Sequence, residues 1–108
     1  MLLGLDLGTG SAKALLIEAS GTVRGEGAAS YPGRSPRPDW AETDPRGWWE
    51  ACAKAVRAAV EGRSTSVAAL GLSGQMHGEV LSDAAGNPTM QAVIWADTRS
   101  AGMLGRYR

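Results

Sequence analysis

The sequence has few of the residues that build a large core or a metal centre. Its 108 residues include one Cys, one His and no Phe. Leu, Ile and Val together number 18, and Ala alone also numbers 18. One Cys excludes an internal disulfide, and one Cys with one His cannot build a zinc site. Because a core dominated by Ala and Gly is thin for this length, the sequence predicts an incomplete domain.

Net charge and long apolar runs are also lacking. The 11 basic and 11 acidic residues are mixed along the chain, so no basic stripe attracts nucleic acid or an anionic membrane. No stretch approaches the ~20 apolar residues of a membrane span, and the first residues lack the basic region of a secretory signal. The sequence therefore predicts a cytoplasmic protein with at most one domain and with neither nucleic acid nor membrane as a partner.

Apolar runs bounded by turn residues predict a mixed α/β fold with the order β-β-β-α-β. Strands are expected at residues 2–7, 12–18, 22–30 and 67–73. Tight turns join the first three strands, which indicates an antiparallel meander. Because a helix precedes the fourth strand, that strand is expected to lie parallel to a strand of the meander.

One helix is clearly indicated in the middle of the chain. Asp44 is suited to the N-cap and Pro45 to the first helical position, and apolar residues recur at helical spacing until Gly62. Trp48 and Trp49 are neighbours on this helix, and both are expected to reach into the core.

The remaining segments are expected to be less regular. Residues 31–43 contain three of the five prolines, so they are expected to form a surface loop. Short strands at 79–82 and 92–95, with a turn at 83–88, predict an appended β-hairpin. A weak helix is expected over residues 99–108.

Residues 6–13 are the first candidate site. Their sequence, DLGTGSAK, places a carboxylate at the end of a strand expected to be buried, followed by two glycines, two hydroxyls and a lysine. This set of groups is suited to holding phosphate and its metal. A strand rather than a helix follows, which excludes a P-loop, and Lys13 stands where the Rossmann fingerprint needs glycine. The alternative is an ordinary hairpin turn, although a buried Asp6 without a partner would be costly there.

The second candidate is GQMHG, residues 74–78, directly after the expected parallel strand. Ligands favour the carboxyl ends of parallel strands. Gln75 and His77 can exchange hydrogen bonds with the hydroxyls of a polyol, and Met76 can cover an apolar edge. A polar turn with a satisfied histidine is the alternative.

In their order and spacing, five stretches resemble the start of an FGGY-family carbohydrate kinase. They are residues 6–13, WAETDP at 40–45, the Trp48–Trp49 pair, GQMHG at 74–78 and WADTR at 95–99. The resemblance implies an RNase H-like domain of the actin-like ATPase and sugar kinase superfamily. It also implies ATP with Mg²⁺ as cofactor and transfer of the γ-phosphoryl group to the 5-hydroxyl of D-xylulose, a pentulose sugar.

Site residues follow from the resemblance position by position. Thr9, Gly10, Ser11 and Lys13 match positions that contact the ATP phosphates, and Asp6 matches the aspartate that faces the metal through water. Met76 and His77 match positions that touch the sugar, where glycerol kinases carry Arg-Glu, and Gln75 is assigned to the sugar with them because of its hydrogen-bonding groups. Asp97 and Arg99 are assigned to support of the sugar pocket. Gly10-Ser11 departs from the more usual Thr-Ser-Gly order, which leaves the hydroxyl contacts of the turn open.

The resemblance implies that residues 1–108 form the N-terminal part of the first of two kinase domains. The second domain and the catalytic base are expected beyond Arg108, so this chain alone is expected to be inactive. A homodimer of the full-length protein is compatible with the resemblance. Two other hypotheses remain open: a sister kinase acting on another ketose or polyol, and a non-enzymatic binding domain of actin-like or RNase H-like type.

Overall fold

The computed structural model describes residues 1–63 and 67–107, which form two compact units. Unit 1 consists of Met1–Tyr31 and Arg46–Gln75. Unit 2 consists of Pro32–Pro45 and the chain from Met76 onward. The predicted end of the last helix, Arg108, lies outside the described residues.

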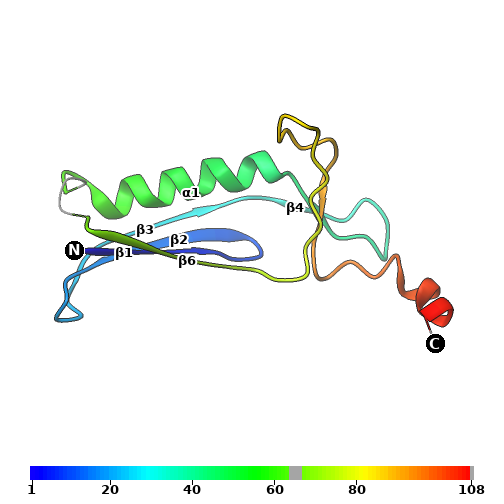
Figure 1. Ribbon diagram of the computed structural model, residues 1–108, viewed down its shortest axis with the longest axis horizontal. Helices are drawn as coiled ribbons and strands as arrows, with labels where there is room; N and C mark the ends of the chain where they lie inside the picture. Colours follow the sequence, from blue (N-terminus) through cyan, green and yellow to red (C-terminus); the bar gives the residue numbers. More distant parts are fainter. Residues whose placement is uncertain (64–66, 108) are drawn as a thin grey trace. The chain divides into compact units, whose positions relative to one another are not determined.

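A four-stranded sheet forms the body of unit 1 (Figure 1). Its strands are β1 (Leu2–Leu7), β2 (Ser11–Ile17), β3 (Val23–Ser30) and β6 (Ala69–Gly74), in the order β3-β2-β1-β6. β1 is antiparallel to β2 and parallel to β6, and β2 is antiparallel to β3. The predicted meander and the predicted parallel strand are therefore confirmed.

Helix α1 (Pro45–Val60) lies along one face of this sheet (Figure 1). Its buried residues are Ala51, Ala55 and Ala59, which belong to one core cluster with Leu3 and Leu16 of the sheet. The helix starts at the predicted proline. Gly62 follows its end with a φ of +67°, a left-handed conformation that favours glycine and stops a helix.

The expectation that both tryptophans reach the core is wrong for Trp49. Trp48 packs against the core cluster, whereas the side chain of Trp49 is 77% exposed. Successive residues turn by ~100°, so Trp49 lies about 200° around the helix from Ala51, on the opposite face. The line of small alanines decides which face of the helix meets the sheet.

Two glycines of β3 explain how closely α1 approaches the sheet. A Cβ at Gly25 would overlap the carbonyl oxygen of Ala59, and one at Gly27 would overlap that of Ala55. Side chains are therefore excluded at both positions, and the helix backbone packs directly on the strand. The core is thin, as the composition indicated, because alanines face glycines across it.

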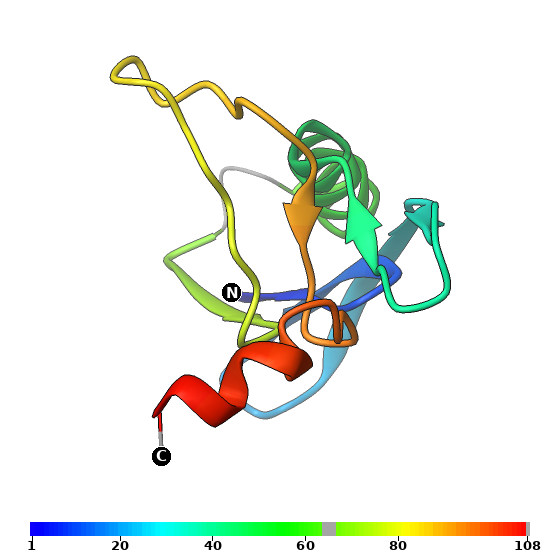
Figure 2. The same cartoon turned by 90° about the vertical axis from the view of Figure 1, so that its right-hand side faces the viewer.

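Unit 2 contains a small sheet of three two-residue strands. They are β4 (Gly33–Arg34), β5 (Glu42–Thr43) and β7 (Ala92–Val93), in the order β4-β5-β7. Figure 2 shows β5 and β7 side by side. The prediction that residues 31–43 form only an irregular surface loop is therefore wrong. Glu42 and Thr43 pair with a distant strand and are buried, and Tyr31 is buried in unit 1.

The appended hairpin is present in reduced form. Isolated bridges join Glu79 to Val93 and Ser82 to Pro88, and Asp83 closes the predicted turn by accepting hydrogen bonds from the amides of Ala85 and Asn87. The predicted C-terminal helix is a 3-10 helix, η2 (Ala101–Tyr107).

Candidate functional site

The glycine turn of unit 1 joins β1 to β2, as predicted. The Gly8 amide donates a hydrogen bond of 3.0 Å to the Ser11 carbonyl and closes the turn. Thr9 and Gly10 lie exposed at its tip. The Gly8 amide is therefore used inside the turn and is not available to a ligand.

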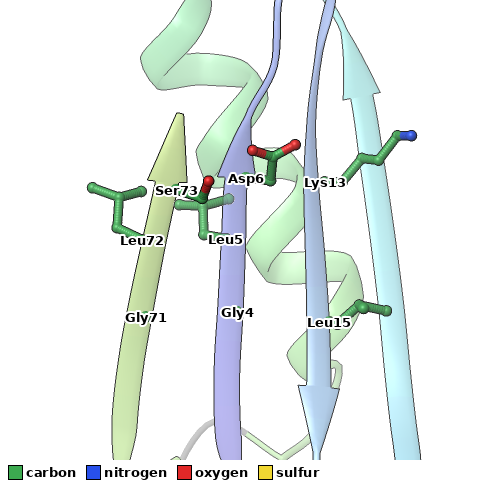
Figure 3. A pocket seen from close by; sticks show the side chains of 8 residues that line it. All are labelled: Gly4, Leu5, Asp6, Lys13, Leu15, Gly71, Leu72 and Ser73. Carbon is green, nitrogen blue, oxygen red and sulfur yellow. The ribbon is translucent and has the colours of Figure 1, made fainter. Parts of the chain in front are cut away.

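Asp6 and Lys13 lie opposite each other on neighbouring strands, next to this turn. Ser73 of β6 is the partner of Asp6 on the other side, so the three side chains form a row across the sheet. Figure 3 shows this row at one end of an open cavity of about 490 Å³. No ion pair joins Asp6 to Lys13 in the part of the chain that the structure describes.

The expectation that Asp6 is buried is wrong. Strand residues alternate between the two faces of a sheet, and β1 directs Leu3 toward α1. Asp6 therefore belongs to the face that α1 does not cover, and it is exposed there. Burial of this carboxylate therefore does not distinguish a binding site from an ordinary hairpin. The row of Asp6, Lys13 and Ser73 beside the turn favours a binding site.

Gln75 follows β6 directly, at the end of unit 1 that carries the glycine turn. Its backbone amide donates a hydrogen bond of 2.9 Å to the Leu7 carbonyl, which places it beside the end of β1. Both polar atoms of its side chain are buried, and neither has a hydrogen-bond partner among residues 1–63 and 67–107. Buried amides are nearly always paired, so this side chain fits a role in binding a polar ligand.

His77 belongs to unit 2 and has an unusual backbone. Its φ is 58°, and it is the one non-glycine residue with positive φ among residues 1–63 and 67–107. Such conformations are sparsely populated and cluster at functional sites. His77 lines a cavity of about 420 Å³ together with Glu79, Trp95, Asp97 and Arg99. The Met76 side chain, which precedes it, is 71% exposed.

Arg99 is the centre of the polar contacts in unit 2. Its guanidinium donates to both carboxylate oxygens of Asp97, at 2.8 and 2.6 Å, and to Glu42 Oε1 at 2.8 Å. The side chain of Asp97 is only 3% exposed. The hydrogen bonds from Arg99, with a backbone hydrogen bond from Ala41, hold the pKa of the Asp97 carboxyl well below its usual range.

Trp40 and Ala41 complete this network, which ties residues 39–42 to residues 97–99. The Arg99 guanidinium lies 3.7 Å from the centre of the Trp40 ring, and Asp97 Oδ2 accepts a hydrogen bond of 2.7 Å from the Ala41 amide. Sequence reasoning missed Glu42, because the WAETDP stretch shows no partner for its carboxylate. Only the fold brings it to Arg99.

The donor groups beside the turn fit a magnesium nucleotide. Mg²⁺ usually keeps several waters and binds through one or two carboxylates together with phosphate oxygens, and Asp6 offers one such carboxylate. Among residues 1–63 and 67–107 no cluster of three or more His, Cys, Asp or Glu side chains is arranged to hold a metal ion. Lys13 and the turn amides offer positive groups for phosphate.

Within the described residues, no helix is both long enough and apolar enough to cross a membrane.

The sheet of unit 1 is an antiparallel meander to which one parallel strand is added. A helix covers one face of this sheet, and a glycine turn joins the first two strands. This arrangement defines an actin-like α/β fold. Residues 1–107 match the N-terminal domain of the FGGY family of carbohydrate kinases. The chain belongs to this family, so the predicted family and fold class are confirmed.

Curated relatives include two kinds of kinase. The chain is 38% identical over 102 residues to the xylulose kinase of Escherichia coli strain K12, covering 94% of this chain and 21% of that protein. It is 36% identical over 106 residues to the glycerol kinase of Thermococcus onnurineus strain NA1, covering 95% of this chain and 22% of that protein.

A crystal structure of a "xyloylose kinase" from Brucella ovis has the same fold. It superposes with a TM-score of 0.90 at 38% identity, covering 98% of this chain and 23% of that one. The chain therefore spans about a fifth of the length of the kinases it matches.

Proposed function

We propose that the full-length protein transfers the γ-phosphoryl group of ATP to a sugar hydroxyl. The observation that carries this proposal is the row of Asp6, Lys13 and Ser73 beside the glycine turn, in a chain of the FGGY family. Phosphoryl transfer depends on positioning and charge neutralisation more than on covalent chemistry of the protein. A carboxylate, a lysine and a turn of backbone amides suit that task.

The phosphate side of the site is assigned to the turn. Thr9, Gly10 and Ser11 bind the phosphates through backbone amides and hydroxyls, and Lys13 neutralises phosphate charge. Asp6 would hold the metal, through water. Mg²⁺ bound with the nucleotide would neutralise charge that develops on the transferred group.

For the sugar we propose D-xylulose, phosphorylated at its 5-hydroxyl. Gln75, Met76 and His77 are assigned to it. The unpartnered amide of Gln75 and the place of His77 in a polar cavity support sugar binding. The identity to a glycerol kinase favours a polyol such as glycerol as the second candidate. The family resemblance speaks against glycerol, because it implies Arg-Glu in glycerol kinases at the positions of Met76 and His77.

Asp97 and Arg99 are assigned to support of the sugar pocket. Their bonds to Glu42 and Ala41 hold the backbone beside the cavity that His77 lines. Because both carboxylates are already bonded to Arg99, neither serves as the catalytic base in this proposal.

We assign the chain to the N-terminal part of the first of two kinase lobes. The second lobe and the aspartate that deprotonates the sugar belong to the rest of the protein. Such an enzyme would work in the cytoplasm, where ATP is available.

The test is a substrate panel with the full-length protein. ADP release is measured with D-xylulose, D-ribulose, D-gluconate and glycerol, each with MgATP. We expect kcat/KM to be highest for D-xylulose. A higher value for another substrate would identify the protein as a related kinase that acts on that substrate. No ADP release with any of a wider set of sugars and polyols would overturn the kinase proposal.

A further inference from the structure

Tyr31 makes two hydrogen bonds to the glycine turn, although it lies about twenty residues further along the chain. Its phenol hydroxyl donates to the Gly8 carbonyl. Its backbone amide donates to the Gly10 carbonyl at 3.1 Å. One residue therefore holds the carbonyl on each side of Thr9.

Tyr31 is itself anchored in the core of unit 1. Its side chain is 6% exposed and belongs to the core cluster beneath α1. The start of that helix passes close by, because a Cβ at Gly47 would lie 3.9 Å from the Tyr31 Cβ. The ring thus has a fixed position from which its hydroxyl can hold the turn.

The Tyr31 phenol keeps its proton, and so stays a hydrogen-bond donor, at neutral pH. Burial, with contributions from the nearby Cys52 and Asp6, raises the pKa of the Tyr31 phenol above its usual value. The hydroxyl therefore keeps its proton and continues to donate to the Gly8 carbonyl.

Fixing these two carbonyls also fixes two amide groups. The Gly8 carbonyl and the Thr9 N–H belong to one planar peptide unit, and the Gly10 carbonyl and the Ser11 N–H belong to another. No peptide bond among the described residues is cis, so each N–H points opposite to the carbonyl of its unit. The orientation of the Thr9 and Ser11 amides is thus set by Tyr31.

We propose that Tyr31 is a positioning residue that holds the peptide planes of the Gly8–Ser11 turn in the orientation that binds the phosphates of ATP. This inference rests on the proposed function, because it assigns a role to the amides of that turn. Preorganised amides bind an anion without first losing backbone entropy, and a turn with two glycines has much entropy to lose.

The direct test is Tyr31→Phe in the full-length protein, which removes the hydroxyl and keeps the ring. We expect the Kd of ATP with Mg²⁺, measured by calorimetry, to rise about three- to tenfold, the effect of one lost hydrogen bond. The KM for ATP should rise with it, while the KM for the sugar stays within about twofold.

Thr43→Val is the matched control. Thr43 is also buried, and its hydroxyl donates a hydrogen bond of 3.3 Å to the Pro32 carbonyl, in unit 2. This variant should lose stability with no change in the Kd of ATP. An unchanged Kd in Tyr31→Phe, or an equal loss for ATP and sugar in both variants, would overturn the inference.

Hydrogen exchange of the wild-type protein provides a readout that needs neither turnover nor a variant. Binding of ATP with Mg²⁺ should slow exchange of the Tyr31 amide together with the Thr9 and Ser11 amides, while the Gly21 turn stays unchanged. Protection of the turn without protection of Tyr31 would contradict the role of Tyr31. Absence of any ATP binding by the wild type would instead overturn the proposed function.

Discussion

His77 combines a side chain suited to a sugar with a backbone that is costly for a side chain to adopt. A φ of 58° is disfavoured for most residues, and His tolerates it better than most. If the residue at position 77 served only to form the turn, glycine would adopt this backbone conformation at a lower cost. The presence of an imidazole there is consistent with a use for its ring, which substitution can test.

We expect His77→Gly and His77→Ala in the full-length enzyme to lower kcat/KM for D-xylulose by similar factors. The loss corresponds to about 1–3 kcal/mol of transition-state stabilisation, because a sugar hydroxyl loses its partner. The thermal stability of the two should differ, since glycine adopts positive φ without strain and alanine does not. Steady-state kinetics and thermal melts measure the two effects. Wild-type kcat/KM in His77→Gly would assign His77 to the turn and not to the sugar.

At the scale of elements, the packing of α1 on β3 depends on glycine. Gly27 lies directly beneath the Ala55 carbonyl, so even one methyl group has no room there. The thin core offers no large side chain that could move aside, because backbone and alanine atoms form the contact.

Gly27→Ala should therefore lower the free energy of unfolding by about 1–3 kcal/mol, the usual cost of overpacking. Urea denaturation of the full-length protein measures it. Gly102→Ala is the control, since a Cβ there would meet nothing within 4 Å. If Gly27→Ala proved no less stable than Gly102→Ala, the close helix–strand contact would be wrong.

At the scale of the whole molecule, much apolar surface of unit 1 lies exposed. Leu70 and Leu72 of the edge strand β6 are 58% and 73% exposed. The kinases that the chain matches are about five times longer than the matched segment. Closure of an enzyme around its substrates contributes positioning worth several kcal/mol, so a chain proposed to be part of one lobe should not suffice alone.

We expect the 108-residue chain alone to release no ADP with D-xylulose and MgATP, and to bind MgATP only weakly by calorimetry. The full-length protein in the same assays is the positive control. Turnover above the blank by the purified chain would contradict the assignment of the base and second lobe to the rest of the protein.

The sequence by itself determined the elements whose signals are local. The meander and α1 were predicted correctly, because each signal lies within a few residues of the structure it specifies. These signals are the apolar run before the glycine turn, Asp44-Pro45 at the start of the helix and Gly62 at its end. Chain connectivity predicted a parallel fourth strand, but only the structure shows that this strand pairs with β1. The motifs at 6–13 and 74–78 led to the family for the same reason, since each is a short continuous stretch.

Only the tertiary structure decided which face each element buries and which distant residues meet. Asp6 was predicted to be buried and is exposed. Trp49 was predicted to reach the core and faces outward, because a line of alanines rather than the largest side chains of the helix meets the sheet. Glu42 meets Arg99 from 57 positions away, and Tyr31 meets Gly8 from 23. A charged or phenolic side chain carries no local sign of its partner, so these contacts exist only once the chain has folded.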